Sequence, residues 1–240
     1  MKYSALVPVK TLALAKSRLA ASLTQHQRES LVLDMLQHVV TTLNDSEIFE
    51  QVYVVSADAR VLELVQHWGA EPLRETRAGH NPALQAAAET ILERTAWRHG
   101  VHLAGSRPGE QTTLRHKGSD SRWSQLRDTI GLLTISADLP LLSLADIHAL
   151  IKASEHYQVV LASSSEGTGT NALLLRPPLI LPYLFGLNSL PAYIAAARKH
   201  RLRSTLVTSV NLAFDIDTGD DLYKLEHESP AWSSLASMAI

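Results

Sequence analysis

Short apolar segments alternate with amphipathic helical segments along most of this chain, and the alternation limits the fold more than any other feature of the sequence. The apolar segments predict strands at 3–9, 51–56, 130–136, 157–162, 172–175 and 212–216. Helical spacing predicts helices at about 25–43, 59–68, 82–95, from about 144, at 189–200 and after 218. Strands that alternate with helices form a mostly parallel, sometimes mixed sheet covered on both faces. The sequence therefore predicts a single α/β domain.

Polar residues at the expected helix starts support this interpretation. Thr24 with Gln27, and Ser143 with Asp146, have the spacing of a capping box, in which side chain and backbone satisfy each other at the helix start. Gly69 follows the second helix, where a left-handed cap is easiest for glycine. Three further helix starts are expected at Pro82, Ser189 and Thr218.

The segment 99–128 interrupts the alternation. It is rich in Gly, Ser, Thr, Arg and His and shows neither helical nor strand periodicity. We interpret it as an insertion that is either disordered, which its polar composition favours, or a mobile lid. The domain is expected to span 1–225, and the Ser- and Ala-rich end of the chain, 226–240, is expected to be a loosely ordered tail.

Charge and composition exclude several classes of function. Lys and Arg number 22 against 24 Asp and Glu, so the formal net charge is −2 and no broad basic surface for nucleic acid is indicated. The absence of cysteine excludes disulfides, thiolate metal sites and a cysteine nucleophile. The first residues enter a strand-like segment directly, and no apolar stretch reaches the roughly 20 residues of a membrane span. A soluble, cytoplasmic protein without membrane or nucleic-acid partners is therefore expected.

Basic residues follow the first strand, at the sheet edge where ligands of open parallel sheets bind. Lys10, Lys16 and Arg18 occur there with no acidic residue before Glu29. Three cations in one segment could surround a triphosphate, with Arg18 as a two-pronged donor and the lysines as point charges. The alternative is an ordinary solvated basic loop.

Acidic residues follow two other strands. Asp138 comes directly after a buried strand and just before Pro140, and Asp215 and Asp217 alternate along an extended segment and so project to the same side. Mg²⁺ prefers such hard oxygen ligands and fills its coordination sphere with water and phosphate oxygens. Each acid alone could equally occupy a turn or a helix cap. Together, after distant strands, they predict a metal site.

Two glycine-containing segments could bind an anion. Residues 166–171 read EGTGTN, and residues 185–189 read FGLNS at a helix start, where backbone N–H groups and the helix dipole favour phosphate or carboxylate. Plain turns and serine caps give the same patterns. The chain contains no P-loop, no Gly-x-Gly-x-x-Gly, no His-Glu-x-x-His and no Gly-x-Ser-x-Gly motif.

Taken in order, these segments resemble the phosphoenolpyruvate/2-phospho-L-lactate guanylyltransferase family of deazaflavin coenzyme F-420 biosynthesis. The resemblance covers roughly 5–222, interrupted by the insertion. It rests on VPVKTLALAKSRL (Val7–Leu19), GHNPAL (Gly79–Leu84), SADLPLLS (Ser136–Ser143), GTGTNALLL (Gly167–Leu175), FGLNS (Phe185–Ser189) and DIDTGDDL (Asp215–Leu222). Family members often have an aromatic residue and then a histidine after the position of Ser189, where this chain reads LPAY.

The resemblance implies a Rossmann-like nucleotidyltransferase domain and a division of roles among the residues. Asp138, Asp215 and Asp217 match the family's Mg²⁺ positions and, with Lys10, are the expected catalytic residues. The acid substrate is expected at Lys10, Thr170, Gly186 and Ser189. The nucleotide is expected at Lys16, Arg18 and Asn81, with Asn81 facing the nucleoside.

The resemblance also implies the reaction. A phosphate oxygen of a small phosphorylated acid attacks the α-phosphorus of GTP in line, and pyrophosphate leaves. The longer basic opening segment, VKTLALAKSRL, looks more like the bacterial members of the family, and this resemblance implies phosphoenolpyruvate rather than 2-phospho-L-lactate as the acceptor. Alternatives are another acceptor, such as a sugar phosphate, molybdopterin or 3-phosphoglycerate, and a noncatalytic nucleotide-binding regulator. The sequence leaves the oligomeric state open, and a homodimer or a downstream transferase of the same pathway is compatible with it.

Overall fold

A seven-stranded mixed sheet forms the centre of the molecule, in the order β3-β2-β1-β4-β6-β5-β7. The computed structural model describes residues 1–101, 121–228 and 232. The strands are β1 (Lys2–Val9), β2 (Phe49–Ser56), β3 (Glu71–Arg74), β4 (Ile130–Ile135), β5 (Val159–Ser163), β6 (Thr170–Leu175) and β7 (Ser204–Leu206). The helices are η1 (Leu12–Leu14), η2 (Ser17–Leu19), α1 (Gln25–Asp45), α2 (Ala59–His67), α3 (His80–Arg98), α4 (Ser121–Asp128), α5 (Leu144–Ser154), α6 (Ser189–Lys199), α7 (Val210–Ala213) and α8 (Gly219–Glu228).

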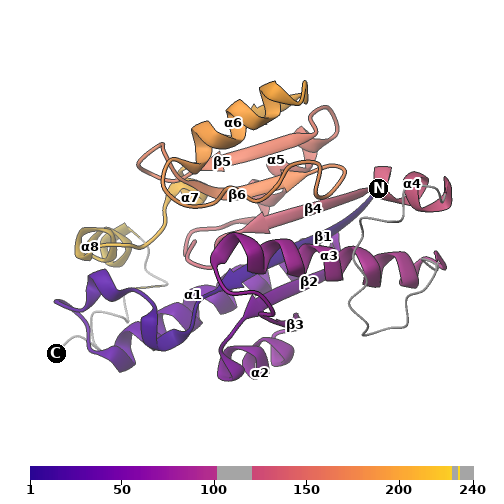
Figure 1. The fold of residues 1–240 in the computed structure, drawn as a ribbon. Helices are drawn as coiled ribbons and strands as arrows, with labels where there is room; N and C mark the ends of the chain where they lie inside the picture. Colours follow the sequence, from indigo (N-terminus) through magenta and orange to yellow (C-terminus); the bar gives the residue numbers. More distant parts are fainter. Residues whose placement is uncertain (102–120, 229–231, 233–240) are drawn as a thin grey trace.

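One strand of the sheet runs against the others. β1 pairs in parallel with β2 and β4, β2 with β3, and β5 with β7, whereas β6 is antiparallel to both β4 and β5. The first residues of β6 consequently lie at the edge where the parallel strands end, and the Ser136 amide donates to the Asn171 carbonyl at 2.8 Å. In Figure 1 this carboxyl edge faces the indigo segment after β1 and the yellow helix α8.

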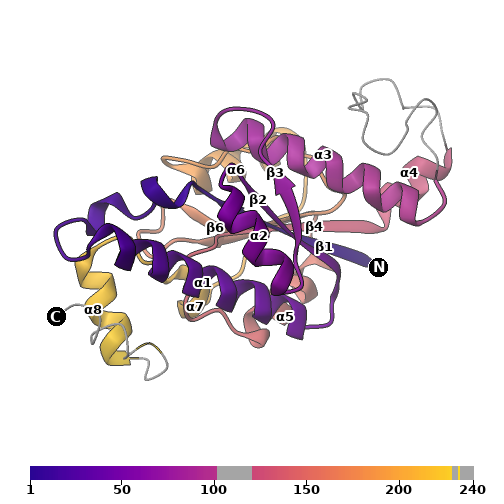
Figure 2. The same ribbon diagram turned by 90° about the horizontal axis from the view of Figure 1, so that it is seen from below.

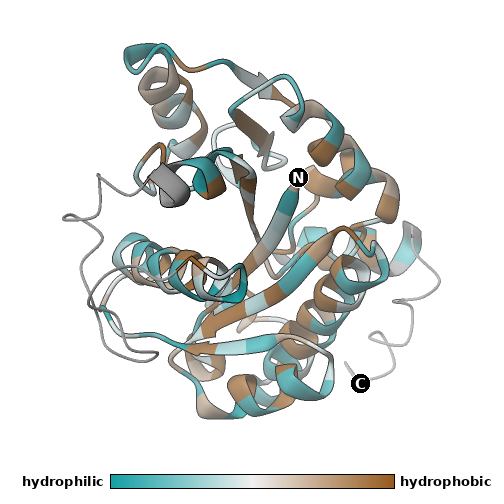
Figure 3. Ribbon diagram, turned by 90° about the vertical axis from the view of Figure 1, so that its right-hand side faces the viewer, coloured by the Kyte–Doolittle hydropathy of each residue, from teal (hydrophilic) through white to brown (hydrophobic). Residues whose placement is uncertain are grey.

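Helices cover both faces of the sheet, as the alternation of elements predicts. One face packs against α1, α2, α5, α7 and α8, through a large core cluster that includes Val7, Leu36 and Leu133. The other face packs against α3 and α6, where Leu6 and Tyr53 are fully buried. Figure 2 shows α3 and α1 on opposite sides of the strands, and Figure 3 shows apolar strands between helices with polar outer surfaces. Period-two alternation therefore distributes each strand's side chains between the two cores.

The helix caps agree with most of the sequence expectations. Both predicted capping boxes are present, Thr24 with Gln27 and Ser143 with Asp146. Thr218 Oγ1 accepts a hydrogen bond from the Asp221 amide at 3.3 Å, as expected for the last helix. Gly69 has φ of 82°, and Pro82 lies in the first turn of α3.

Several expectations were wrong. Residues 212–216 do not form a strand: Leu212 and Ala213 end α7, which is capped by Ser209, whose Oγ accepts from the Leu212 amide at 3.3 Å. Ser189 is not the cap of α6, because Asn188 occupies that position with φ of 56°. β3 and β7 had not been predicted from the sequence.

The expected insertion is partly helical. Its last part forms the helix α4, which contradicts the expectation that 99–128 lacks secondary structure. This helix is held in place by Leu126, which packs against a small cluster of Leu92, Ala96 and Ile130. Residues 102–120, for which disorder or a lid was expected, lie outside the described residues. The described flanks of this gap, the end of α3 and the start of α4, lie near the amino-terminal ends of the strands (Figure 1).

The chain after 225 contributes to the described structure. α8 extends to Glu228, three residues past the expected domain end. Trp232 packs against the main core, and its Nε1 donates to the Pro140 carbonyl at 3.2 Å. Its ring lies edge-on to His38, with centroids 6.0 Å apart. A part of the expected tail therefore contacts the segment that follows β4.

Candidate active site

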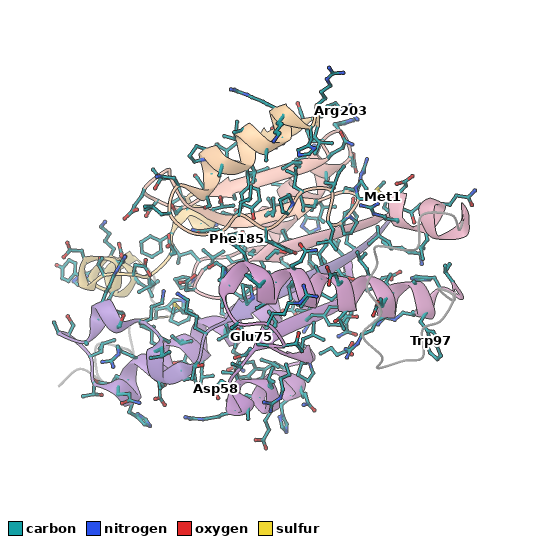
Figure 4. The ribbon with its side chains drawn as sticks, viewed as in Figure 1. Met1, Asp58, Glu75, Trp97, Phe185 and Arg203 are labelled. Carbon is teal, nitrogen blue, oxygen red and sulfur yellow. The ribbon has the colours of Figure 1, made fainter. Side chains whose placement is uncertain are left out.

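The segment after β1 brings the expected basic residues over the carboxyl edge. The Leu12 amide donates to Asp58 Oδ2 at 3.0 Å, which ties this segment to the start of α2, where Figure 4 labels Asp58. Lys16 adopts a left-handed backbone conformation, with φ of 49°. A residue with a Cβ atom adopts this conformation at a cost of about 1–2 kcal/mol, and such residues concentrate at functional sites.

The Lys16 ammonium lies between two of the predicted acids. It makes a very short ion pair with Asp138 and a second ion pair with Asp217 Oδ1 at 3.2 Å, while the Lys16 side chain is only 9% exposed. Burial lowers the pKa of Lys16, but the adjacent charges of Asp138 and Asp217 outweigh it and the pKa is raised. Burial raises the pKa of Asp138, but Lys16 outweighs it and the pKa is lowered. Both groups are therefore charged at neutral pH.

Arg18 completes this ion network at the surface. Its Nη1 lies 3.3 Å from Asp217 Oδ2, and its side chain is 72% exposed. An exposed pair of this kind contributes about 0–1 kcal/mol to stability, so the pair itself does not explain why the guanidinium is here. The guanidinium can exchange Asp217 for a bound anion at little cost.

Asp215 is held beside these residues by Asn171. The Asn171 Nδ2 donates to Asp215 Oδ1 and to the Leu212 carbonyl, both at 3.1 Å. Burial raises the pKa of Asp215, and the negative charges of Asp138 and Asp217 add to this, against the opposing effect of the Asn171 hydrogen bond. The three predicted acids therefore come from distant parts of the chain and interact electrostatically at one place.

In the structure, two of these acids bind a side-chain cation, the Lys16 ammonium. Among the described residues, no group of three or more His, Asp or Glu side chains is arranged to hold a metal ion. The Lys16 ammonium pairs with two of the three carboxylates instead. The donor chemistry of three carboxylates nevertheless fits Mg²⁺, provided that Lys16 moves to other partners.

Three of the four predicted acid-binding residues, Thr170, Gly186 and Ser189, also lie together. The Ser189 hydroxyl donates to Thr170 Oγ1 at 3.0 Å, and both side chains are buried. The Ser189 amide donates to the Gly186 carbonyl at 3.2 Å. Gly186 has φ of 129°, a conformation that favours glycine, and a Cβ atom there would meet nothing within 4 Å. The backbone at Gly186 is thus open on the side where a side chain would lie, three residues before the buried Ser189.

Lys10 and Asn81 lie near the start of α3. Lys10 is exposed, and after burial its positive charge is the second cause that lowers the pKa of His80, the first residue of α3. The Asn81 side chain is engaged with the protein: its Nδ2 donates to the Phe185 carbonyl and its Oδ1 accepts from the Phe185 amide, both at 2.9 Å. The expected nucleoside contact of Asn81 stays a prediction.

The comparison with family models identifies the family. The model described as "Guanylyl transferase CofC like" matches residues 3–96 and 123–229 and omits 97–122. This match covers most of the chain. The chain belongs to the CofC-like guanylyl transferase family.

Curated relatives agree with this membership. The phosphoenolpyruvate guanylyltransferase of Rubrobacter xylanophilus is 36% identical over 94% of each chain. The enzyme of the same name from Sphaerobacter thermophilus is 34% identical over 96% of this chain and 95% of its own. The 3-phospho-D-glycerate guanylyltransferase of Colwellia psychrerythraea is 28% identical over 92% of this chain and 90% of its own.

Solved structures share the fold at low sequence identity. A Desulfovibrio desulfuricans protein described as a nucleotide-diphospho-sugar transferase has a TM-score of 0.68 at 13% identity and covers 99% of this chain and 95% of its own. CMP:2-keto-3-deoxy-manno-octonic acid synthetase with bound CTP has a TM-score of 0.53 at 13% identity, covering 99% of this chain and 100% of its own. These likenesses confirm the predicted nucleotidyltransferase-like fold. Within the described part of the chain, no helix has the length and apolar character needed to cross a membrane.

Sequence reasoning missed residues that hold the site in place. Asn171, buried between β4 and the Asp215 segment, was noted only as part of a Gly-Thr turn. Asp146 was predicted as a capping residue, yet it also accepts hydrogen bonds from Ser209 and from Asn211, the latter at 3.0 Å. An amide or carboxylate next to a predicted strand or cap gives no signal of a partner dozens of residues away. Only the tertiary structure reveals these contacts.

Proposed function

We propose that this protein transfers the guanylyl group of GTP to the phosphate of phosphoenolpyruvate and releases pyrophosphate. Membership of the CofC-like guanylyl transferase family supports guanylyl transfer, and the names of relatives such as those from Rubrobacter and Sphaerobacter support the acceptor. The observation on which the proposal rests is the meeting of Lys16, Asp138 and Asp217 at the carboxyl edge. Coenzyme F-420 biosynthesis is the pathway that this reaction serves in the family.

Lys16 and Arg18 are proposed to bind the GTP phosphates. In the structure, both cations are satisfied by carboxylates that lie at the same edge. A triphosphate offers more negative charge to them than Asp138 and Asp217 do, and the exposed Arg18 can form two parallel hydrogen bonds to phosphate oxygens. The cations then neutralise charge that develops on the leaving pyrophosphate.

Asp138, Asp215 and Asp217 are proposed to hold Mg²⁺ once Lys16 has turned to the nucleotide. The metal ion, when bound, would neutralise charge on the phosphates and orient them for in-line displacement. Burial first, and then its acidic neighbours, raise the pKa of Asp215, an effect that a cation held by these residues would offset. A divalent ion would also reduce the charge repulsion among the three carboxylates.

The acid substrate is proposed to lie near Thr170, Gly186 and Ser189, with Lys10 as a further cation. The Ser189 hydroxyl donates to Thr170, which leaves the Thr170 hydroxyl proton to donate to a carboxylate or phosphate, and the open space beside Gly186 admits a ligand close to the backbone. A phosphomonoester is anionic at neutral pH, so its oxygen can attack without a general base. Positioning and charge stabilisation are then the whole of the catalysis that the residues supply.

The decisive experiment measures pyrophosphate release by the purified protein with GTP, Mg²⁺ and one acid at a time. Phosphoenolpyruvate, 2-phospho-L-lactate and 3-phosphoglycerate serve as acceptors, CTP and UTP as nucleotide controls, and EDTA tests the metal. We expect release with GTP and phosphoenolpyruvate only when Mg²⁺ is present. The proposal would be refuted if CTP or UTP supported pyrophosphate release and GTP did not, or if folded protein released no pyrophosphate with any acceptor.

One observation favours a second acceptor. The Colwellia relative is a 3-phospho-D-glycerate guanylyltransferase and covers nearly the whole chain. The two acids differ by a hydroxyl group, by the C=C double bond of phosphoenolpyruvate and by the carbon that bears the phosphate, and a site built to hydrogen-bond the hydroxyl discriminates strongly against an acid that lacks it. A preference for 3-phosphoglycerate in the same assay would establish this alternative.

A further inference from the structure

We infer that Asn81 is a positioning residue for the acid substrate: it holds the segment 185–189 in the conformation that presents Gly186 and Ser189. The inference rests on the proposed guanylyl transfer to a small phosphorylated acid. It gives Asn81 a role on the acceptor side of the reaction. A nucleoside contact, which the sequence had suggested, would place Asn81 on the GTP side.

Asn81 binds the backbone of Phe185 as a neighbouring strand would. Its Nδ2 and Oδ1 pair with the Phe185 carbonyl and amide at 2.9 Å each, so one side chain satisfies both peptide groups of a residue 104 positions away. The adjacent His80 and Phe185 rings lie edge-on with centroids 5.7 Å apart. Figure 4 labels Phe185 beside the first turns of α3.

Apart from the Asn81 bonds, side chains fix the two ends of the segment 185–189: the Phe185 ring lies against those of Tyr183 and Tyr193, with centroids 6.0 and 5.5 Å away, and the Ser189 hydroxyl donates to Thr170. Gly186 and Asn188 have φ of 129° and 56°, and the Leu187 side chain between them is 94% exposed. Neither positive-φ residue extends a helix or a strand, so the segment needs contacts from outside itself to keep one conformation. Nearby support comes from the Tyr193 hydroxyl, which accepts from the Leu184 amide at 2.8 Å, and from the Thr168 carbonyl, which accepts from the Leu190 amide at 3.0 Å.

Both functional groups of the Asn81 amide are used by these two bonds. A side-chain amide can donate two hydrogen bonds and accept two, and here one of each is made with Phe185. Rotation of the amide toward a nucleoside would break both bonds and release the segment that carries Gly186. The geometry therefore points to an effect of Asn81 on the acid substrate, transmitted through Phe185.

The test compares Asn81→Ala and Asn81→Asp with wild type in steady-state kinetics. Asn81→Ala removes both bonds, whereas Asn81→Asp keeps an acceptor for the Phe185 amide and loses the donor to its carbonyl. We expect Asn81→Ala to raise the KM for the acid about tenfold, which corresponds to about 1.4 kcal/mol, while the KM for GTP changes less than twofold. Asn81→Asp should give a smaller increase.

Asn44→Ala is the matched control. This substitution also removes a side-chain amide that donates to a backbone carbonyl, that of Trp68, at 2.9 Å. The lost hydrogen bond, however, joins α1 to the end of α2 and lies in neither proposed substrate site. This variant should lower stability and leave both KM values unchanged. A rise in the KM for GTP in Asn81→Ala, with no change for the acid, would overturn the inference in favour of a nucleoside contact.

Hydrogen exchange separates this inference from the proposed function, because it requires no turnover. We expect the peptide that contains Phe185 and Gly186 to exchange about tenfold faster in Asn81→Ala than in wild type, and Asn44→Ala to leave it unchanged. Faster exchange in a protein that is inactive with every acid would support the structural half of the inference while the proposed function fails. Unchanged exchange would overturn the inference even if the enzyme is active.

Discussion

Asp215 lies in surroundings that oppose its charge. Burial and the neighbouring Asp138 and Asp217 raise its pKa, and Asn171 offsets this only in part. A carboxylate kept in such a place lowers the stability of the protein when it is charged, so a functional reason for it is expected. A cation that binds on substrate entry would supply that reason.

Replacing Asp215 with Asn should therefore abolish most of the activity and leave the fold intact. We expect kcat for pyrophosphate release to fall at least about 10²-fold, a loss typical of removing a charge that stabilises the transition state. Circular dichroism and thermal unfolding should show a protein at least as stable as wild type, because a buried charge has been removed. Asp220→Asn, at the exposed start of α8, is the control. Near-normal activity of Asp215→Asn would exclude Asp215 from the catalytic site.

At this scale, sequence reasoning identified the charged residues and missed their partners. Lys16, Asp138 and Asp217 could be predicted because each charged side chain follows a strand or lies in a basic segment. That Lys16 would pair with two of the acids could not be predicted, because the pairs join residues 122 and 201 positions apart. The same holds for Asn171, whose amide meets Asp215 only after β4 and β6 have paired.

Between elements, Asp146 links α5 to α7. It closes the capping box of α5, and it also accepts from Ser209 and from Asn211 at the start of α7. Burial raises the pKa of Asp146, but the hydrogen bonds from Ser143, Ser209 and Asn211 outweigh it and the pKa is lowered. α7 leads directly into the segment of Asp215 and Asp217. Asp146 therefore fixes the start of the segment that carries Asp215 and Asp217.

Asp146→Asn should lower the free energy of unfolding by about 1–3 kcal/mol at pH 7, the usual loss when a hydrogen bond to a buried charged group is weakened. Because the pKa is lower in the folded state, the stabilisation is complete above the ordinary value of about 3.9 and is lost as the pH falls through the folded value. Urea unfolding of both proteins between pH 7 and pH 3 should show the difference narrowing only below about pH 4. Asp45→Asn, at the exposed end of α1, should show no loss. A difference that stays constant with pH would contradict the assignment.

The elements that sequence reasoning missed share a physical cause. β3 and β7 are edge strands of four and three residues, and each has a single strand partner among the described residues. Such short segments do not show a period of two, and β3 contains Pro72, which is unusual in a strand interior. Residues 212–216 are mostly apolar, which suggested a strand, yet Asn171 and Ser209 bind the backbone of Leu212 and prevent strand pairing there. Side chains from elsewhere in the chain decided these local structures.

At the scale of the whole molecule, one antiparallel strand, β6, brings the second half of the site to the same edge of the sheet as the first. The parallel strands deliver Lys10 and Asp138 to the carboxyl edge, as predicted for an α/β sheet. Because β6 runs the other way, it delivers Thr170 and Asn171 at its beginning to the same edge. The alternation of elements predicted the sheet and its covered faces. The alternation could not predict that β6 is antiparallel. The short turn between β5 and β6 is compatible with more than one way of pairing the two strands with the rest of the sheet.

The position of the insertion relative to this edge leads to a prediction for the whole molecule. The family model matches on both sides of 97–122 and omits that segment, and the described flanks lie near the amino-terminal ends of the strands, away from the carboxyl edge (Figure 1). Replacing residues 102–120 with a flexible Gly/Ser linker keeps α3, α4 and the contacts of Leu126. Because the free energy of closing a loop changes only slowly with its length, the free energy of unfolding should change by less than about 1 kcal/mol.

We expect this variant to keep kcat and both KM values within about twofold of wild type, since no proposed substrate contact is removed. Thermal unfolding and the pyrophosphate assay measure the two effects separately. The control replaces Leu126 with Ala in the full-length chain, which should destabilise the protein by weakening its contact with Leu92 and Ile130. If the linker variant folds normally but loses activity, the insertion acts on the reaction, as the lid interpretation requires. If it keeps activity, the carboxyl edge alone carries the chemistry.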